Sequence, residues 1–528
     1  MNSFTEDVPD APNSASAQLL AALATDLQLV DFTVDGVASM LGEEASQALD
    51  REQPIPAKLR CRVLIGGSGA EAVLAVVVLL WLLGDTVTEE DLANAFKNLT
   101  VDTLLELRLV ERSDDGLRAA VDLRPYSSDA DGDLWVASDL GFRQRAGVLR
   151  HDHVLGIGQA SLTLAQVTMR TPVQTALDLG TGCGIQTFHL LSHVRHVTAT
   201  DISSRALAFT RFNLLLNAHA LNIDPTNTED RVTLLQGNLL DAVAGQTFDL
   251  VVSNPPFVIT PRSSGESADS QYTYRDGGLP GDQIVASLLQ KLPDLLNPGG
   301  SAQMLGNWEI SENTSWEERV ASWVPDAVDA WVIQREAVSP SHYAETWLRD
   351  AAENREPAAY EAAFAAYLED FASRNVSSIG FGMVWLRNPA VGKRTLNRFE
   401  DITHDVEQPL GAHLQAAVER SDWLTLNSSD LESQHLQVAD DVTEERHQRP
   451  GAEHPGVILL RQGAGLRRTN LMSTELTGFV SASDGELAVG QIIGALAALL
   501  DRDDAAFRSG LSEEVRNLVR DGFLTPVP

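Results

Sequence analysis

The sequence Asn254-Pro255-Pro256-Phe257 follows Phe248–Ser253, an apolar run with the composition of a buried strand. Proline has no N–H group, so the carbonyl oxygen before each proline is available to a ligand. The amide oxygen of Asn254 and the carbonyl of Pro255 can then hold both hydrogens of an –NH2 group. A planar nitrogen of this kind is a poor nucleophile, and binding both hydrogens orients it toward an electrophile. Phe257 offers a flat face to a planar group.

A glycine-rich turn precedes this motif in the chain. Asp178 ends an apolar run, and Gly180, Gly182 and Gly184 follow it before a helical segment. Glycines in such a turn permit positive φ and let the backbone approach a ligand closely. The dinucleotide fingerprint G-x-G-x-x-G would need glycine where Ile185 stands, so that pattern fails. The spacing D-x-G-x-G-x-G favours a ligand without a pyrophosphate.

Polar side chains also end the next two predicted strands. Asp201 lies 23 residues after Asp178, at a position where a carboxylate can accept both ribose hydroxyls of an adenosine. Ser203 is placed to cap the following helix. Asn238 follows the third strand, where its side chain can reach an adenine amine. Three polar groups at consecutive strand ends, beside a glycine turn, predict an adenosine-binding site.

Together these motifs resemble class I methyltransferases of the small-domain (MTS) type, which include HemK-like glutamine methyltransferases and guanine-N2 methyltransferases of ribosomal RNA. The resemblance covers residues 150–310 well and extends weakly to 390. It implies S-adenosyl-L-methionine as cofactor and a Rossmann-like class I methyltransferase fold. The cofactor-binding residues that it implies are Asp178, Gly180, Gly182, Gly184, Asp201, Ile202, Asn238 and Asn254. The catalytic residues that it implies are Asn254, Pro255, Pro256 and Phe257.

The chain departs from the family at two of these positions. Phe257 stands where the glutamine methyltransferases usually have tyrosine, and Asn238 where an aspartate is common. The predicted reaction is direct transfer of a methyl group to a planar amide or amino nitrogen, without a metal. The macromolecular substrate is then a protein glutamine, as in a translation factor, or the exocyclic amine of guanine N2 or adenine N6 in RNA or DNA. The third alternative is a non-catalytic winged-helix regulator.

Formal net charge distinguishes these substrates to some extent. The chain carries a formal net charge of −35, which opposes non-specific binding to a phosphate backbone. The charge and the HemK-like motif slightly favour a protein substrate over a nucleic acid. The predicted winged helices favour a nucleic acid.

Two further segments lie where they can border the site. In the sequence DHVLGIGQASLTLA, four residues are candidate contacts of a segment that covers the cofactor: Gly156, Gly158, Ser161 and Thr163. Residues Tyr274–Asp282 are rich in turn formers and lie after the catalytic motif, so they are placed either to shape the substrate entrance or to form a simple connection.

Strands and helices alternate between Thr171 and Arg387, which predicts an α/β fold with a mostly parallel sheet of seven strands. A helix is predicted within residues 350–375, before the last strand. The seven predicted strands are Thr175–Leu179, His196–Thr200, Arg231–Gln236, Phe248–Ser253, Ser301–Gly306, Asp329–Gln334 and Ser378–Leu386.

The remaining chain is predicted to form flanking domains. Residues 1–17 are polar and predict a disordered tail, and 18–126 predict a winged-helix-like domain or, alternatively, a helical packing domain with a β-extension. The methyltransferase domain is expected at 127–395 and an extension with an acidic linker at 396–456. Residues 457–528 predict a smaller α+β domain, also winged-helix-like.

Cysteine usage and hydropathy limit other classes of protein. Cys61 and Cys183 are the two cysteines and stand far apart, so neither a disulfide framework nor a cysteine zinc site is expected. The longest apolar run, Ala72–Leu83, has 12 residues and is too short for a bilayer. The N-terminus has no positively charged region of a secretion signal. A cytoplasmic protein without a membrane or metal partner is therefore expected.

Overall fold

The computed structural model describes residues 3–128, 132–141, 144, 150–261, 278–350, 357–390, 394–502 and 504–527. The chain divides into two compact units. Unit 1 comprises Met1–Ala165, Thr171–Asp326 and Glu336–Ala390, and unit 2 comprises Gln166–Arg170, Ala327–Arg335 and Val391–Pro528.

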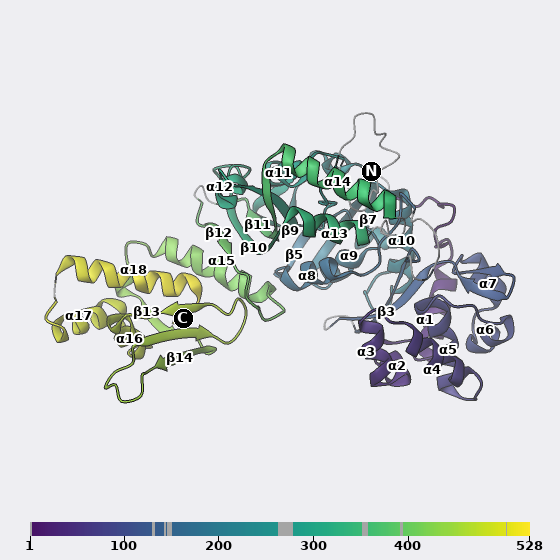
Figure 1. The fold of residues 1–528 in the computed structure, drawn as a ribbon, viewed down its shortest axis with the longest axis horizontal. Coiled ribbons are helices and arrows are strands. Elements are labelled where there is room, and N and C mark those ends of the chain that lie inside the picture. Colours follow the sequence, from purple (N-terminus) through teal and green to yellow (C-terminus); the bar gives the residue numbers. More distant parts are fainter. Residues whose placement is uncertain are drawn as a thin grey trace. The chain divides into compact units, whose positions relative to one another are not determined.

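The strands between Val173 and Asp401 form a sheet of eight described strands in the order β12-β10-β11-β9-β8-β5-β6-β7 (Figure 1). β5 is parallel to both β6 and β8, and β11 runs antiparallel to β9. The strand bounds are β5 Val173–Leu179, β6 Val194–Asp201, β7 Val232–Gln236, β8 Phe248–Ser253, β9 Leu296–Ser311, β10 Asp329–Val338, β11 Val376–Arg387 and β12 Asn397–Asp401. The predicted α/β class is confirmed, and all seven predicted strands are present. β12, an eighth strand parallel to β10, lies beyond them.

Helices connect these strands, as expected for a mostly parallel sheet. Their bounds are α8 Gln159–Val167, α9 Ile185–Leu191, α10 Ser204–Leu216, α11 Gln283–Lys291, α12 Trp316–Ala321, α13 Pro340–Asp350 and α14 Pro357–Ser373. Ser203 caps α10 as predicted, because its hydroxyl accepts a hydrogen bond from Ala206 N at 3.2 Å. The inserted helix before β11 is α14. The sequence analysis missed α13, although Ser339 before Pro340 is a helix-start signal.

The N-terminal part of unit 1 is mostly helical. Its elements are α1 Ala17–Leu29, α2 Val34–Leu41, α3 Glu43–Asp50, α4 Ile55–Ile65, α5 Ala70–Val77, the π-helical turn Val78–Leu82, α6 Glu89–Ala95, α7 Val101–Glu106, and the hairpins β1 Val110–Ser113 with β2 Gly116–Ala119 and β3 Asp122–Ser128 with β4 Gly132–Ser138. Val87 forms an antiparallel bridge with Leu117 of β2. From α5 onward the order is a helix (α5), the bridge residue Val87, two further helices (α6 and α7) and the β1–β2 hairpin. The winged-helix assignment of this order stays a prediction.

One helical stretch in the described part of the chain, Ala17–Leu41, is long and apolar enough to span a membrane by length and composition alone. It consists of α1 and α2, which are separated by the helix cap at Thr33. Leu20, Leu23 and Leu27 of α1 are fully buried in the protein. Of the apolar window within this stretch, 39% is buried, and core helices can pass the same test of length and composition.

The prediction of a disordered tail is wrong for residues 3–16. The backbone N–H of Phe4 donates to Leu234 O of β7 at 2.7 Å, and Ser3 Oγ accepts from Leu234 N at 2.9 Å. β7 is the outermost strand on its side of the sheet, so its edge has backbone groups free to pair. Phe4 and Ala11 are buried. The polar composition of the segment hides the few residues that make these contacts.

Unit 2 contains two three-stranded sheets, β17-β13-β18 and β14-β15-β16. Its elements after β12 are α15 Gly411–Leu426, β13 His435–Val438, β14 Val442–His447, β15 Val457–Gln462, β16 Thr469–Leu471, α16 Thr474–Ser481, β17 Asp484–Ala488, α17 Val489–Leu499, α18 Ala505–Asp521 and β18 Leu524–Pro526. Leu436, Phe479, Ile493, Val515 and Phe523 lie in its core. The elements α16, β17, α17, α18 and β18 follow the order helix, strand, helix, helix, strand. This order is similar to that from α5 to the β1–β2 hairpin, and its assignment to a winged helix also stays a prediction.

The acidic linker predicted within 396–456 is corrected by the structure, because β13 and β14 lie in its second half; β12 and α15 occupy the part predicted as an extension. β13 and β14 are short, and β14 carries several charged residues, so neither gives a clear strand pattern. β13 obtains its partners, β17 and β18, from much later in the chain.

Candidate active site

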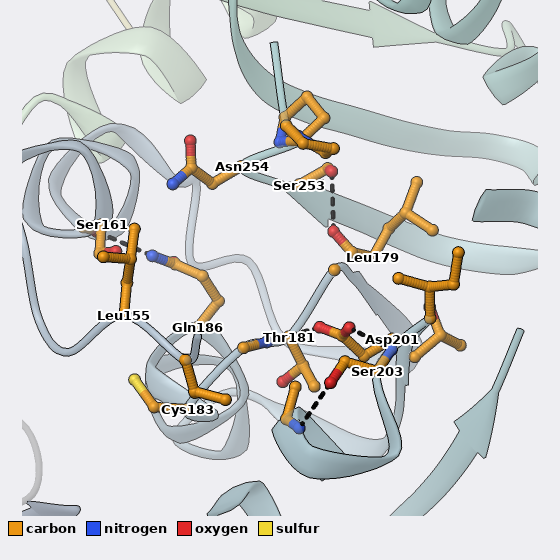
Figure 2. A pocket seen from close by; sticks show the side chains of 18 of the residues that line it. Leu155, Ser161, Leu179, Thr181, Cys183, Gln186, Asp201, Ser203, Ser253 and Asn254 are labelled. Carbon is orange, nitrogen blue, oxygen red and sulfur yellow. Dashed lines mark hydrogen bonds between the residues drawn. The ribbon is translucent and has the colours of Figure 1, made fainter. Parts of the chain in front are cut away.

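A cavity of about 430 Å³ lies at the carboxyl ends of β5, β6 and β8 in unit 1 (Figure 2). In open α/β sheets this is where ligands bind, because the chain reverses direction across the sheet there. Three segments that were singled out from sequence converge on it. The predicted site residues that line it are Gly180, Gly182, Asp201, Ile202, Asn238, Asn254, Pro255 and Pro256. Asp178, Gly184 and Phe257 are not among the lining residues.

The glycine turn between β5 and α9 adopts the conformation that the sequence predicts. Gly180, Gly182 and Gly184 have φ of +79°, +58° and +92°, which favour glycine. A Cβ at Gly180 or Gly182 would meet no atom within 4 Å, so backbone conformation rather than crowding explains these two glycines. Gly184 lies below the cavity, and a Cβ there would approach Thr210 Cγ2 to 3.1 Å. It serves helix packing.

Asp178 is 1% exposed and lies beneath this turn. Its Oδ2 accepts hydrogen bonds from Thr181 Oγ1 at 2.8 Å and from Thr187 Oγ1 at 2.7 Å. Burial raises the pKa of Asp178 to about 6, and the two threonine hydroxyls counteract part of that shift. In this geometry Asp178 holds the turn in place. Direct contact with a cofactor stays a prediction for this residue.

Asp201 lines the cavity at the end of β6. Its Oδ2 accepts from Gly182 N at 3.0 Å and its Oδ1 from Ser203 N at 2.9 Å. Burial raises its pKa, although these backbone hydrogen bonds oppose the shift. Each carboxylate oxygen has a second lone pair, so the side chain keeps acceptor capacity for two hydroxyls. Ile202 beside it is 49% exposed and presents an apolar surface at the cavity.

Asn254 follows β8, and its side chain stands in the cavity opposite the glycine turn (Figure 2). Asn254 Oδ1 is buried and has no hydrogen-bond partner within the described part of the chain. Its neighbour Ser253 is fixed, because Ser253 Oγ donates to Leu179 O at 2.8 Å and so joins the ends of β8 and β5. A buried polar atom without a partner is unfavourable unless a ligand completes it. The orphaned oxygen therefore marks a position for a hydrogen-bond donor.

A segment at residues 153–161 also borders the cavity. Gly156, Gly158 and Ser161 line the cavity as predicted, whereas Thr163 does not. Gln186 Nε2 of α9 donates to Ser161 O at 2.8 Å. Gln186, Cys183, Leu239 and Ile284 also line the cavity and were not predicted from the sequence. Cys183 lies at a variable position of the glycine motif, and the other three lie outside the motifs, so no residue-type signal marks them.

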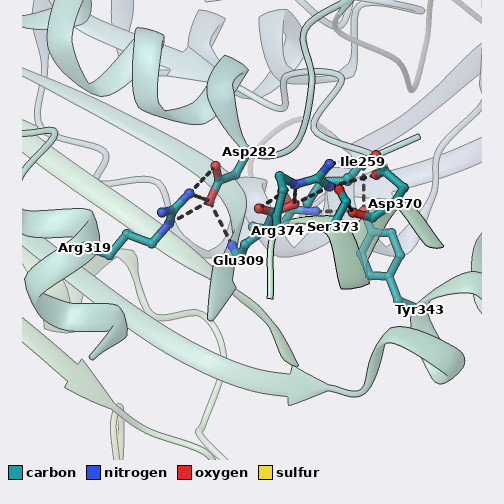
Figure 3. A network of polar contacts seen from close by, with 9 residues as sticks. Ile259, Asp282, Glu309, Arg319, Tyr343, Asp370, Ser373 and Arg374 are labelled. Atoms are coloured by element: carbon teal, nitrogen blue, oxygen red, sulfur yellow. Dashed lines mark hydrogen bonds and ion pairs between the residues drawn. The ribbon is translucent and has the colours of Figure 1, made fainter. Parts of the chain in front are cut away.

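Beyond the cavity, a polar network contacts the chain that follows Asn254–Phe257 (Figure 3). Tyr343 of α13 is fully buried, and its hydroxyl accepts from Ile259 N at 2.8 Å and from Asn307 Nδ2 at 2.9 Å. Ile259 lies five positions after Asn254. α13 and α14 thus form an insertion between β10 and β11 whose Tyr343 fixes the backbone downstream of the motif.

The same network contains three ion pairs. Asp282 binds Arg319 at 2.8 Å and also accepts from Glu309 N at 2.9 Å. Arg374, directly after α14, joins Glu309 and Asp370, each at 2.7 Å. Of the predicted entrance segment Tyr274–Asp282, residues 274–277 lie outside the described residues. Gly278 lines the cavity and Asp282 is anchored in this network.

No group of three or more His, Cys, Asp or Glu side chains is positioned to hold a metal ion in the residues that the structure describes.

Comparison with known proteins agrees with this geometry. Residues 139–269 match the family model described as "Methyltransferase small domain", and residues 29–120 match a "Domain of unknown function (DUF7059)". The chain is 34% identical over 140 residues to a release factor glutamine methyltransferase of Rhodopirellula baltica, which covers 24% of this chain and 43% of that protein. It is 29% identical over 163 residues to a ribosomal protein uL3 glutamine methyltransferase of Bradyrhizobium diazoefficiens, with 30% and 47% covered. The chain spans less than half the length of these relatives.

Solved structures give weaker matches. An rRNA methylase from Streptococcus thermophilus is 13% identical with a TM-score of 0.23, covering 44% of this chain and 99% of that one. A Thermus thermophilus 16S rRNA N2 G1207 methyltransferase in complex with AdoMet and guanosine is 19% identical with a TM-score of 0.24, covering 42% and 54%. The family match and the curated relatives confirm the predicted resemblance: residues 139–269 of this chain are similar to the methyltransferase small domain.

Proposed function

We propose that this chain is an S-adenosylmethionine-dependent N-methyltransferase that acts on the side-chain amide of a protein glutamine. The observation that carries the proposal is Asn254 Oδ1, which is buried at the cavity without a hydrogen-bond partner among the described residues. An amide –NH2 group supplies the missing donor. Names of the curated relatives support the substrate class, since they are glutamine methyltransferases of release factors and of ribosomal protein uL3.

The residues present fit the proposed cofactor. Asp201 has free acceptor capacity for the two ribose hydroxyls. Ile202 offers an apolar surface to the adenine ring, and Asn238 lies close by at the cavity. The backbone of Gly180 and Gly182 lacks side chains, so a ligand can approach it closely. A cavity of about 430 Å³ is within the range of small-molecule sites.

S-adenosylmethionine, when bound, supplies an activated methyl group that needs no metal. The part of the protein is to position the substrate nitrogen. Asn254 Oδ1 and the carbonyl of Pro255 accept the two amide hydrogens and so orient the nitrogen lone pair. The same acceptors stabilise the positive charge that develops on the amide as its nitrogen is methylated, and the proton leaves afterwards. Pro255, Pro256 and Ile284 are apolar lining residues that exclude water.

Two alternatives remain to be tested. The amine of guanine N2 or adenine N6 in RNA or DNA presents the same two hydrogens, and the element order of Ala70–Ala119 would suit a nucleic-acid reader. The net charge of −35 counts against that substrate. A non-catalytic regulator would need no orphaned acceptor at Asn254. A cytoplasmic location belongs to the same proposal, because the substrates named for the relatives are translation proteins.

The deciding experiment uses tritiated S-adenosylmethionine, the full chain and three acceptors. These acceptors are a release factor, ribosomal protein uL3 and total RNA, all purified from one bacterial source. The matched pair of variants is Asn254→Ala and Asn227→Ala, since Asn227 is exposed and lies outside the cavity lining. We expect label in a protein acceptor with wild type and Asn227→Ala and its loss with Asn254→Ala. Mass spectrometry should then place one methyl group on a glutamine.

If label appeared in RNA alone, the substrate would be a nucleobase and not a protein glutamine. No label in any acceptor, together with measurable binding of S-adenosylmethionine, would favour the regulator. Label in protein on a residue other than glutamine would refute the substrate class while leaving methyl transfer intact.

A further inference from the structure

A second cavity lies within unit 2 and has a different character from the first. Its volume is about 120 Å³, less than a third of that of the proposed methyltransferase cavity. Arginines from four separate segments line it: β12, α15, the turn before β16, and the end of α18. These arginines are Arg398, Arg420, Arg468 and Arg520.

Two of these arginines are neutralised by carboxylates. Arg468 binds Glu400 at 2.6 Å, and Arg398 binds the same carboxylate at 2.8 Å. Arg398 also lies 2.8 Å from Asp521. These pairs account for the positive charge of Arg398 and Arg468 and explain why burial at this point is tolerated.

The other two arginines are different. Arg420 has no carboxylate oxygen within 4.0 Å in the described residues, and its Nε is buried there without a hydrogen-bond partner. Burial lowers the pKa of Arg420, and the charges of Asp521, Asp441 and Glu419 oppose this shift in part. Arg520 donates to the side-chain oxygen of Asn517, a neutral acceptor. Both guanidinium groups therefore line the cavity without an ionic partner from the described part of the chain.

The backbone around Arg420 accommodates this arrangement. Gly522 ends α18 with φ +86°, and a Cβ at this position would stand 2.7 Å from Arg420 Nη2. Glycine thus leaves the space that the guanidinium occupies. Asp441 and Asp521 also line the cavity, and the charge of Glu419 acts on Arg420 as well. Glu400 and Asp521 pair with Arg398 and Arg468, so neither Arg420 nor Arg520 has a carboxylate at ion-pair distance among the described residues. The carbonyl end of α18 adds a partial negative charge near Arg520.

A poorly solvated guanidinium without a partner is unfavourable, and a bound anion removes that cost. The planar fork of arginine matches the oxygens of a tetrahedral oxyanion, and hydrogen bonds between such charged groups are strong. We propose that this cavity binds a phosphate group through Arg420 and Arg520. Its volume of about 120 Å³ is sufficient for one phosphate group.

The first test is a titration of inorganic phosphate with the full chain, followed by the phosphorus NMR line width. Wild type should broaden the signal in a saturable way, sulfate should compete, and chloride at equal ionic strength should not. Arg420→Met should weaken phosphate binding by about tenfold or more, as expected when one charge-assisted contact is lost. The matched control is Arg446→Met, because Arg446 is exposed on β14 of the same unit and pairs with Glu444.

Glycerol phosphate in a parallel titration distinguishes the source of the group. Tighter binding of glycerol phosphate indicates the terminal phosphate of a larger small molecule, and tighter binding of inorganic phosphate indicates the free ion. Arg520→Gln provides a second variant if Arg420→Met does not fold. Equal phosphate binding by wild type, Arg420→Met and Arg520→Gln would overturn the proposal. So would the absence of saturable broadening with wild type.

Discussion

Replacement of Tyr343 by phenylalanine tests whether the α13–α14 insertion positions the catalytic segment. The change removes one oxygen atom and keeps the ring, which packs against Phe371 and Phe381. The hydroxyl accepts two hydrogen bonds, from Ile259 N at 2.8 Å and Asn307 Nδ2 at 2.9 Å. In Tyr343→Phe both buried donors lose their acceptor, which costs about 1–3 kcal/mol for each.

Two separate quantities should change. The free energy of unfolding should fall by a few kcal/mol, because the two lost hydrogen bonds lie in a buried site. The kcat for methyl transfer should fall by roughly ten- to a hundredfold, because a displacement of about 1 Å at a reacting group has effects of that size. The Kd for S-adenosylmethionine should stay within about twofold, because Tyr343 does not line the cavity.

The assay combines urea unfolding, single-turnover methyl transfer and equilibrium cofactor binding. Tyr360→Phe is the matched control, since Tyr360 is half-buried on α14 of the same insertion and packs against Phe364. Loss of stability without loss of kcat would assign Tyr343 a structural role only. If Tyr343→Phe matched Tyr360→Phe in stability and in kcat, the inferred link between the insertion and the catalytic segment would be refuted.

Three other measurements examine the site. Burial raises the pKa of Asp178 from 3.8 to about 6, so the stability that its protonated form contributes is lost as pH rises through about 6. The free energy of unfolding of wild type relative to Asp178→Asn should therefore fall by about 3 kcal/mol between about pH 3 and pH 7. A pH-independent difference between the two proteins would contradict this. Asp201→Asn should raise the Kd for S-adenosylmethionine by about tenfold or more, through loss of charge-assisted hydrogen bonds, and an unchanged Kd in isothermal titration would exclude Asp201 as a ligand. Burial raises the pKa of both Cys61 and Cys183 to about 12, so a thiol reagent should label neither cysteine in the native protein and both after denaturation, and rapid native labelling would disprove the buried geometry.

The sequence alone determined the α/β class and the places of seven strands along the chain, because strongly apolar runs bounded by turn residues leave little choice of element. It also predicted that Gly180, Gly182, Asp201, Asn238 and Asn254 would meet. Their types and their places at strand ends are local properties, and a parallel sheet necessarily brings those ends to one edge. The positive φ of the glycines follows from the same local logic.

Only the tertiary structure decided what each of these groups faces. Asp178 and Asp201 look equivalent in sequence, yet one is enclosed by threonine hydroxyls and the other lines the cavity. Tyr343 contacts Ile259 from far along the chain, and no local pattern encodes that hydrogen bond.

The same limit explains the errors at the ends of the chain. Phe4 pairs with an edge strand more than two hundred residues away, and β13 pairs with strands that follow it by about fifty and ninety residues. Arg398, Arg420, Arg468 and Arg520 are scattered in sequence and form a common cavity only after folding. Propensity and periodicity describe neighbours within a few residues, whereas burial and the pairing of charges depend on long-range contacts. Those contacts determine which polar groups remain without a partner and are free to bind a ligand.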